Sequence, residues 1–281
     1  MKPQTAPRAI TLLTDFGSGS SYVAQMKGVI LAALPSATIV DFSHEIEPQN
    51  ILEAAIYWME AVPVYGAATV HVAVVDPGVG TSRRILLLEL EQGGLLLAPD
   101  NGIAAPLIEL HRARSLFSVE NVALFRASIS STFHGRDIFA PVAAYLAAGG
   151  EPSSVGPVVE TYEPLELRSP TVEILDQRCT ITGEVLVVDR FGNLMTNITR
   201  DLLSQFGAAP QLALSSAEVI LGATSIGAIG RTYGDVEQGE VLALFDSQGR
   251  LEIAVRGGSA ARRFGAATGA RVRVVLDPPR A

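Results

Sequence analysis

The sequence predicts two domains, an α/β N-terminal domain with a mainly parallel sheet and a smaller, mostly-β, barrel-like C-terminal domain. Over residues 1–165, short apolar runs alternate with segments of helical periodicity, which is typical of a sheet covered by crossover helices. Over residues 171–281, the apolar segments are short and strand-like, and glycine, asparagine and aspartate separate them. Prolines and charges interrupt both patterns over residues 160–170 and mark the boundary.

The expected strands of the N-terminal domain are apolar runs, and its expected helices repeat apolar residues three and four positions apart. Prolines end the first two helices because proline cannot continue a helix, and a glycine pair follows the last one. In chain order we expect strand 9–13, helix 22–34, strand 37–40, helix 49–61, strand 68–75, a hairpin of 84–90 with 95–98, helix 103–111, loop 132–137 and helix 138–148.

Four expected strands end in an aspartate, namely Asp15, Asp41, Asp76 and Asp100. The carboxyl ends of parallel strands share one edge of a sheet, and ligands of open α/β folds bind beyond that edge. We therefore expect several of these carboxylates to converge there. For Asp41 and Asp100 a simpler role stays open, as the cap of a helix or turn.

Asp76 begins the loop around which the N-terminal domain is organised. The apolar strand before it ends because Pro77 cannot donate a ladder hydrogen bond, while Gly78 and Gly80 allow backbone conformations that other residues avoid. Arg83 lies seven residues beyond Asp76 and can fold back to pair with it. The pattern leaves two interpretations open, a ligand site at the strand end and an ordinary turn with a surface ion pair.

In the C-terminal domain we expect strands 182–188, 219–221, 240–245, 250–255 and 270–276, with a short helix at 259–264. The first of these strands ends at Asp189, which Phe191, Gly192 and Asn193 follow. An aromatic ring beside an amide can stack on a purine and bind its edge. A type I turn with a half-buried phenylalanine explains the same residues, and both interpretations stay open.

Composition narrows the class of protein. The chain has 281 residues and a formal net charge of −8 at pH 7, which argues against a general nucleic-acid binder because phosphate contacts need a basic surface. No apolar run reaches the roughly 18 residues of a membrane span, and the first nine residues lack the apolar core of a signal peptide. The single cysteine, Cys179, lies in an apparent linker and is expected to be a small hydrophobe; its isolation fits a reducing cytoplasm.

The sequence contains no phosphate-binding loop, zinc signature or nucleophile elbow. Of its four histidines, His44 and His111 are expected to be solvated beside helix boundaries, and His71 to lie in the core. His134 differs because it stands in a Thr-Phe-His-Gly-Arg-Asp loop, where Gly135 would leave room for a ligand. A structural role for this histidine stays open beside the functional one.

Five ordered motifs resemble the S-adenosyl-L-methionine (SAM) hydrolases that form adenosine, also called SAM hydroxide adenosyltransferases, whose halogenating relatives are fluorinase and chlorinase. The motifs are Thr14-Asp15-Phe16-Gly17, Asp76-Pro77-Gly78-Val79-Gly80 with Arg83, Pro99-Asp100-Asn101-Gly102, Phe133-His134-Gly135-Arg136-Asp137, and Asp189 with Phe191-Gly192-Asn193 and Thr196-Asn197-Ile198. The resemblance spans residues 10–276. It implies that Asp76, Arg83 and His134 are a catalytic set, which the halogenases lack, so that water rather than halide attacks.

The same resemblance implies how substrate would be held. Asp15 would bind the ribose hydroxyls, and Asp189 the methionine ammonium. Ser247 matches a carboxylate-binding serine, although Gln248 stands where fluorinase-like sequences have arginine, which leaves open how the methionine carboxylate is neutralised.

The adenine contacts implied by the resemblance lie in the C-terminal domain. Asn193 would bind the adenine edge, Phe191 would pack on the ring, and the backbone around Val255 matches a further adenine-contacting segment. The family is also similar in forming a homotrimer whose sites lie between subunits, each site using the N-terminal domain of one and the C-terminal domain of the next.

The implied reaction is attack of water or hydroxide on the ribose C5′ of SAM, which releases adenosine and L-methionine. The leaving thioether is neutral and needs no proton, so a carboxylate, a guanidinium and an imidazole need only prepare the nucleophile. We expect SAM as substrate, no metal or other cofactor, no nucleic-acid or membrane partner and a cytoplasmic location. Two alternatives stay open, a metal-dependent phosphoesterase using Asp15, Asp76, His134 and Asp137, and a non-catalytic sensor of SAM or adenosine.

Overall fold

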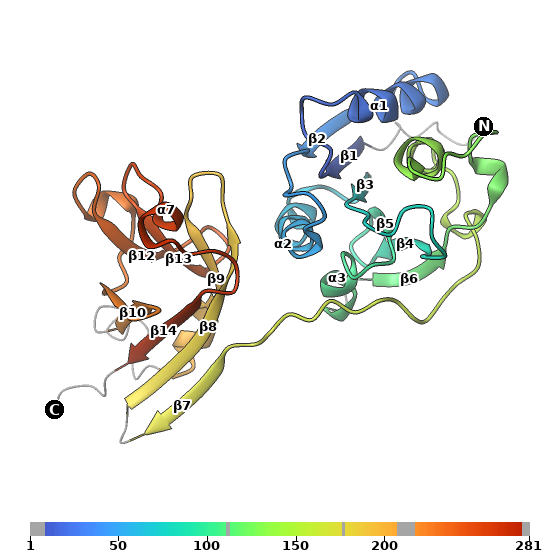
Figure 1. The fold of residues 1–281 in the computed structure, drawn as a ribbon. Coiled ribbons are helices and arrows are strands. Elements are labelled where there is room, and N and C mark those ends of the chain that lie inside the picture. Colours follow the sequence, from blue (N-terminus) through green and yellow to red (C-terminus); the bar gives the residue numbers. More distant parts are fainter. Residues whose placement is uncertain (1–8, 111–112, 176–177, 207–216, 277–281) are drawn as a thin grey trace. The chain divides into compact units, whose positions relative to one another are not determined.

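The computed structural model describes residues 9–110, 113–175, 178–206 and 217–276 (Figure 1). The chain forms two compact units that divide between Glu166 and Leu167. No helix in these described ranges is long and apolar enough to cross a membrane. The expectation for His111 lies outside the described residues.

The first unit contains a six-stranded mixed sheet in the order β2–β1–β3–β5–β4–β6. Its strands are β1 (Ala9–Thr14), β2 (Ile39–Ser43), β3 (Thr69–Val74), β4 (Ile85–Leu90), β5 (Leu95–Pro99) and β6 (Ala113–Ser118). Strands β2, β1, β3 and β5 are parallel, as expected, whereas β4 is antiparallel to both β5 and β6. The expectation of a mainly parallel sheet is therefore only partly right. Gly93 and Gly94, with φ of 84° and 88°, close the tight turn that reverses the chain between β4 and β5.

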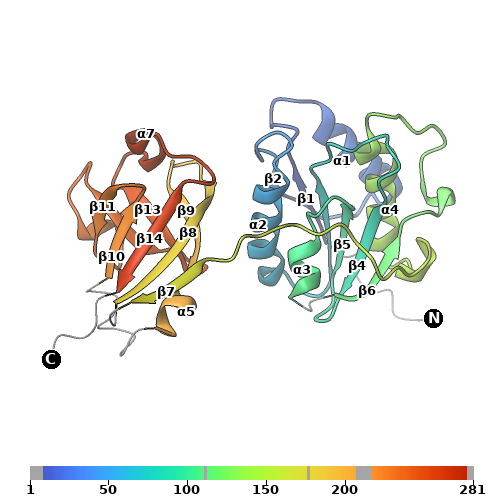
Figure 2. The same ribbon diagram turned by 60° about the horizontal axis from the view of Figure 1, so that its bottom comes forward.

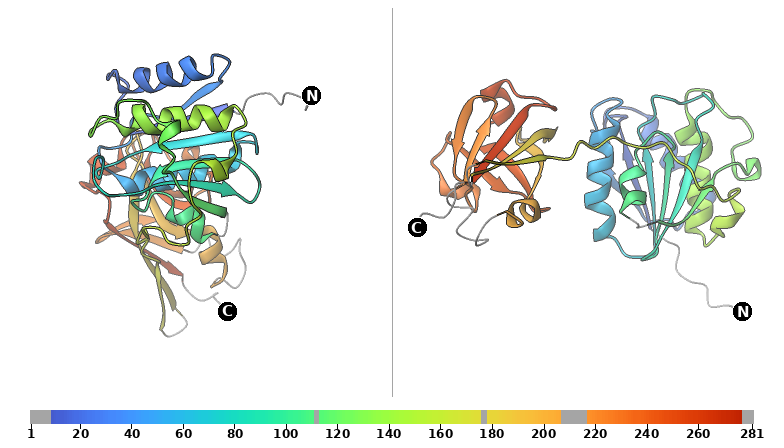
Figure 3. Two further views of the ribbon diagram at one scale, coloured as in Figure 1. Left: turned by 90° about the vertical axis from the view of Figure 1, so that its right-hand side faces the viewer. Right: turned by 90° about the horizontal axis from the view of Figure 1, so that it is seen from below.

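Two helical layers cover this sheet, one on each face (Figures 2 and 3). Helices α1 (Tyr22–Ala33) and α4 (Ala140–Ala147) pack on one face, and α2 (Ile51–Ala61) and α3 (Ala105–Glu109) belong to the other. Successive residues of β1 alternate between the two cores, because strand side chains point to opposite faces in turn: Leu12 lies in the first core and Leu13 in the second. The short helical turns of this unit are η1 (Val62–Val64), η2 (Val122–Leu124), η3 (Gly135–Phe139) and η4 (Pro152–Ser154).

The parallel strands bring three aspartates to one edge of the sheet. Asp15 follows β1 directly, Asp100 follows β5, and Asp76 lies two residues beyond the end of β3. Asp41 does not end its strand as expected, because it lies inside β2. The edge thus gathers three of the four expected carboxylates.

The second unit is a nearly closed, mostly antiparallel sheet in the order β11–β10–β14–β8–β9–β13–β12, with β7 paired to β8. An isolated bridge from Ile229, just beyond β11, to Ala243 of β12 draws its two ends together. The elements are β7 (Thr171–Leu175), β8 (Arg178–Val188), β9 (Leu194–Thr199), α5 (Arg200–Ser204), β10 (Ala217–Leu221), β11 (Thr224–Gly227), η5 (Tyr233–Asp235), β12 (Val241–Phe245), β13 (Arg250–Val255), α7 (Ala260–Phe264) and β14 (Arg271–Leu276).

Cys179 lies inside β8 and not in a linker, opposite Leu276 of β14. Its side chain is buried, and this burial raises the pKa of the thiol. The residue therefore acts as the small core hydrophobe expected, in a different place.

Candidate active site

The loop after β3 folds back on itself because its glycines leave no side chain in the way. A Cβ on Gly78 would lie 3.2 Å from Cγ of Arg83, and a Cβ on Gly80, whose φ is 78°, would collide with the backbone carbonyl of Ser131. The side-chain amide of Asn101 donates to the carbonyl oxygen of Val75 over 2.9 Å and holds the end of the strand. This close packing fixes the loop against the segment that carries His134.

Asp76 and Arg83 form a buried ion pair, as their spacing predicts. Arg83 Nε donates to both carboxylate oxygens of Asp76, at 2.9 and 3.0 Å, and Nη2 also contacts Oδ2. The two side chains are only 4% and 10% exposed, so the interpretation as an ordinary surface ion pair is wrong. The guanidinium carbon lies 6.0 Å from the ring centre of Phe139, which covers it.

His134 completes this cluster. Arg83 Nη2 lies 3.0 Å from His134 Nδ1, and because a guanidinium only donates, Nδ1 accepts and the ring proton is assigned to Nε2. Burial, and then the charge of Arg83, lower the pKa of His134, which favours the neutral ring that this contact requires. Among the described residues, neither Arg83 Nη1 nor His134 Nε2 has a protein acceptor.

The loop expected over 132–137 is found only at its first two residues, because the chain is helical from His134 onward. His134 caps a single π-helical turn, η3, which runs directly into α4. π-Helical turns are rare in proteins, and those that occur are often found at functional sites. Gly135 does not make room for a ligand, because a Cβ there would lie 3.2 Å from the sulfur of Met26 and 3.3 Å from the ring of Phe133. The glycine instead lets this turn pack tightly on α1.

Asp137 lies within the same turn and holds it through its side chain. Its fully buried carboxylate accepts hydrogen bonds from Arg136, from Arg126 and from the backbone N–H of Ser130. The hydrogen bonds from Arg136 contribute most to lowering the pKa of Asp137 to about 2. Because two arginines and a backbone amide already occupy this carboxylate, its contacts support a structural role.

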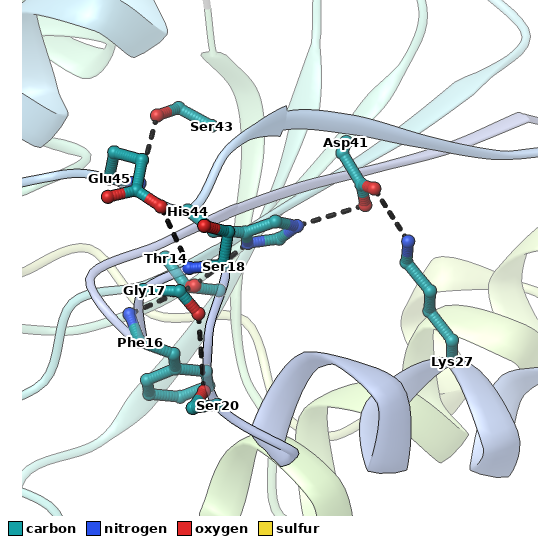
Figure 4. Close-up of polar contacts among 10 residues, drawn as sticks. All are labelled: Thr14, Phe16, Gly17, Ser18, Ser20, Lys27, Asp41, Ser43, His44 and Glu45. Carbon is teal, nitrogen blue, oxygen red and sulfur yellow. Dashed lines mark hydrogen bonds and ion pairs between the residues drawn. The ribbon is translucent and has the colours of Figure 1, made fainter.

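Asp15 lies at the end of β1 with one oxygen held. The backbone N–H of Gln49 donates to Asp15 Oδ2 over 2.8 Å, and no described residue donates to Oδ1. His44 is not solvated as expected: its side chain is 9% exposed and both ring nitrogens have partners (Figure 4). Although burial opposes ionisation of Asp41, hydrogen bonds from Lys27 and His44 lower its pKa.

Asp100 makes structural contacts, but not as the helix or turn cap suggested for it. Its carboxylate pairs with Arg84 and accepts the backbone N–H of Glu163 at 2.8 Å. His71 lies in the core as expected, where burial lowers its pKa to about 4.

In the second unit, Asp189, Phe191 and Asn193 share the turn between β8 and β9. Asp189 Oδ1 accepts the backbone N–H groups of Phe191 and Asn193, both at 2.8 Å, and Oδ2 accepts the amide of Asn193 at 3.0 Å. This turn leaves the Phe191 ring 78% exposed, so the alternative of a half-buried ring is wrong. A flat aromatic surface is thereby presented beside a buried asparagine.

Val255 and Ser247 lie at opposite ends of β13. Ile253 pairs with Leu194, so Val255 lies at the same end of the sheet as Asn193. Ser247 belongs to the exposed turn before β13, whose strand spans roughly 20 Å at about 3.3 Å per residue. Ser247 and Val255 are therefore separated by about the length of this strand.

Sequence reasoning missed a buried acid between these ends. Glu252 is 4% exposed and accepts a hydrogen bond from Tyr233 over 2.7 Å. Burial, and also the nearby charges of Asp189 and Asp246, raise the pKa of Glu252. The sequence of β13 does not predict that Glu252 is buried. Its neighbours Leu251 and Ile253 are buried too, so the strand does not alternate between a buried apolar face and an exposed polar face.

The ligand set suggested for a metal-dependent phosphoesterase is not assembled. Within the ranges that the structure describes, no group of three or more histidine, cysteine or acidic side chains is arranged to hold a metal ion. Asp137 in particular is paired with Arg126 and Arg136.

Both units match known proteins. The model of the SAM hydroxide adenosyltransferase N-terminal domain matches residues 10–156, and that of the C-terminal domain matches residues 183–273. A protein of Salinispora tropica named (R)-S-adenosyl-L-methionine hydrolase is 38% identical over 266 residues, which cover 94% of this chain and 97% of that protein.

Two further relatives extend the comparison. The crystal structure of an uncharacterized conserved protein from Thermotoga maritima has a TM-score of 0.86 at 38% identity, covering 94% of this chain and 99% of that chain. A fluorinase of Actinoplanes is 28% identical over 235 residues, covering 75% of this chain and 78% of that protein. Since the two domain models together match most of the sequence, this chain belongs to the SAM hydroxide adenosyltransferase family.

Proposed function

We propose that this protein is an enzyme that hydrolyses SAM to adenosine and L-methionine by attack of water or hydroxide on the ribose C5′. The observation that carries the proposal is the buried contact of Asp76, Arg83 and His134 in a chain of this family. Relatives named (R)-S-adenosyl-L-methionine hydrolase match nearly the whole chain and support the same substrate.

The proposed catalytic set is suited to holding an anionic nucleophile. Arg83 Nη1 and His134 Nε2 are N–H donors without protein acceptors among the described residues, and donors stabilise hydroxide over water. Asp76 fixes the guanidinium through two contacts with Nε, so that its other nitrogens keep their directions. Hydroxide and sulfonium charges then neutralise each other as the C–O bond forms and the C–S bond breaks.

The sulfonium leaves as a neutral thioether, so the reaction requires no acid for the leaving group. The catalytic set therefore has only to orient the nucleophile and favour its ionised form, contributions that for proton transfer are typically about 10² to 10⁴-fold. A halide would bring its own charge and need no such preparation. This difference favours water over halide as the nucleophile here.

We propose the following roles for the remaining site residues. Asp15 binds the ribose hydroxyls through its free Oδ1. Phe191 stacks on adenine and Asn193 binds the adenine edge, with the backbone at Val255 beside them, while Asp189 binds the methionine ammonium and Ser247 the carboxylate. Support is strongest for the exposed ring of Phe191 and weakest for Ser247, which lies at the far end of β13.

Because these contacts divide between two units, we propose a homotrimer in which each site takes residues from two subunits. The family resemblance supports this assembly, and light scattering of an active species at the mass of a monomer would contradict it. A cytoplasmic location stays a prediction from the single cysteine.

Incubation of the purified protein with SAM, followed by chromatography, tests the function. We expect equal amounts of adenosine and methionine, with and without a chelator. Methylthioadenosine as the product, or activity that a chelator abolishes, would contradict the proposal. SAM that stays bound but intact in a single-turnover experiment would instead indicate a sensor.

A further inference from the structure

Two threonine–histidine pairs involve threonines of β1 in the first unit. Thr11 Oγ1 and His71 Nδ1 are 2.9 Å apart, and so are Thr14 Oγ1 and His44 Nδ1. The first pair joins β1 to β3 inside the sheet, where Thr11 and His71 are register partners. The second pair joins the end of β1 to the loop after β2, which places it beside Asp15.

Among the residues that the structure describes, only the second pair continues into a chain of polar contacts (Figure 4). His44 Nε2 lies 2.9 Å from Asp41 Oδ1, and Asp41 Oδ2 accepts from Lys27 over 2.6 Å. Because a carboxylate accepts, Nε2 donates to Asp41, and Nδ1 is the ring atom that contacts the Thr14 hydroxyl. The backbone N–H of Phe16 in turn donates to Thr14 Oγ1 over 3.3 Å.

This arrangement has the members of a Thr-His-Asp triad but cannot act as one. Thr14 has no exposed surface, so its hydroxyl cannot reach a substrate. Its contacts instead fix the main chain on both sides of Asp15, since Thr14 precedes that residue and Phe16 follows it.

Three further hydrogen bonds join the loop that carries His44 to the loop that carries Asp15. The carbonyl of His44 accepts from the N–H of Gly17 over 2.7 Å, and Glu45 accepts from the N–H of Ser18 over 2.8 Å. Gln49, which has an unfavourable φ of 66°, donates its backbone N–H to Asp15 Oδ2. One oxygen of Asp15 is thus held while the other is left for a ligand.

We propose that His44 is a positioning residue that aims the carboxylate of Asp15 at the two ribose hydroxyls of the substrate, an inference that rests on the proposed function. The Lys27–Asp41–His44–Thr14 chain holds the loop whose backbone presents Asp15. Its loss changes recognition of the hydroxyls and leaves recognition of the base unaffected.

The test compares two ligands, adenosine and 2′,3′-dideoxyadenosine, by titration calorimetry on the full-length protein. The wild type should prefer adenosine by about 10- to 100-fold, because hydrogen bonds to a charged group are strong, and Asp15→Ala should lose most of this preference. His44→Gln should reduce the preference by about 2- to 10-fold while keeping the affinity for the dideoxy compound. His71→Gln is the matched control, and its preference should equal that of the wild type.

Asp41→Asn is a second variant that tests the same inference even if His44→Gln folds poorly. Its side chain is 46% exposed, and the substitution weakens the partner of His44 without opening the core, so the preference should fall in the same direction by a smaller factor. Variants of His44 and Asp41 that keep the wild-type preference would overturn the inference alone. A wild-type protein that does not bind adenosine, or does not prefer it, would overturn the proposed function as well.

Discussion

Two aspartate–arginine pairs at neighbouring strand ends use the same residue types and differ in what surrounds them. Asp76 follows β3 and pairs with Arg83, and Asp100 follows β5 and pairs with the next residue, Arg84. Both carboxylates are 4% exposed. Burial and pairing therefore do not distinguish a catalytic pair from a structural one.

The two pairs differ in the further groups to which each of them hydrogen-bonds. Arg84 donates onward to the carbonyl of Thr161 over 2.8 Å, and Asp100 accepts the backbone N–H of Glu163, so main-chain groups close this pair. Arg83 donates onward to His134, a side chain that can change its charge, and keeps Nη1 without a protein acceptor among the described residues. An ion pair whose further hydrogen bonds go to main-chain groups holds the chain in place. An ion pair that contacts a titratable ring and keeps an N–H donor without a protein acceptor can hold a nucleophile.

The largest effect is expected from Asp76→Asn. The amide keeps the shape but cannot pair with the guanidinium, so kcat should fall by about 10² to 10⁴-fold, the range typical of losing preparation of the nucleophile. The substrate is still bound, so kcat and kcat/KM should fall together. Steady-state kinetics, with circular dichroism to confirm folding, provide the measurement. Turnover close to that of the wild type would show that this pair is structural too.

A smaller effect is expected from acidification. The contact from Arg83 requires an unprotonated Nδ1, and burial together with Arg83 lowers the pKa of His134 below 6.5. The active form is therefore the neutral ring. We expect kcat/KM to be insensitive to this group down to about pH 6.5 and to fall up to tenfold per unit below the lowered pKa.

Protonation of His71 needs to be separated from that of His134. Its pKa is about 4 in the folded protein against 6.5 for an ordinary histidine, so the unfolded chain binds a proton first. Stability is therefore lost as pH falls from about 6.5 towards 4, and ellipticity measured at each pH separates this loss from the rate. An acid limb of kcat/KM centred above pH 6.5, in folded protein, would contradict a neutral His134.

Sequence patterns predicted the parts of this site that depend on local chemistry. A strand ending at Asp76, followed by proline, two glycines and Arg83, dictates a folded-back loop, and the structure confirms the pair. The glycine pair between β4 and β5 likewise predicted their hairpin. Each of these conclusions rests on residues within about ten positions of one another.

The features missed depend on residues that are distant in the sequence. His44 meets Thr14 across 30 positions, and no periodicity around either residue predicts the contact. The antiparallel pairing of β4 with β6 follows from which strand occupies the sheet edge, which local propensity does not determine. The π-helical turn at His134 depends on tight packing of Gly135 against Met26, a residue of α1. Tertiary packing therefore decided these outcomes.

The smallest effect on activity is expected from Asp100→Asn. Its amide oxygen can still accept the N–H of Glu163, but its NH₂ group faces the donors of Arg84. A buried hydrogen-bonding mismatch of this kind costs about 1–3 kcal/mol. Arg84 is 35% exposed and keeps Thr161, so water and the main chain limit the loss.

The expected outcome for Asp100→Asn is a lower melting temperature with almost unchanged kcat. At about 2–4 °C per kcal/mol for a unit of this size, the shift should be roughly 2–12 °C, which differential scanning calorimetry measures. The hydrogen bond that holds the chain just before Asp76 stays intact, because Asn101 and not Asp100 donates to the carbonyl of Val75. The same variant assayed beside Asp76→Asn decides the comparison. If both lose turnover to a similar extent, main-chain partners do not mark a structural pair, and Asp100 belongs to the site.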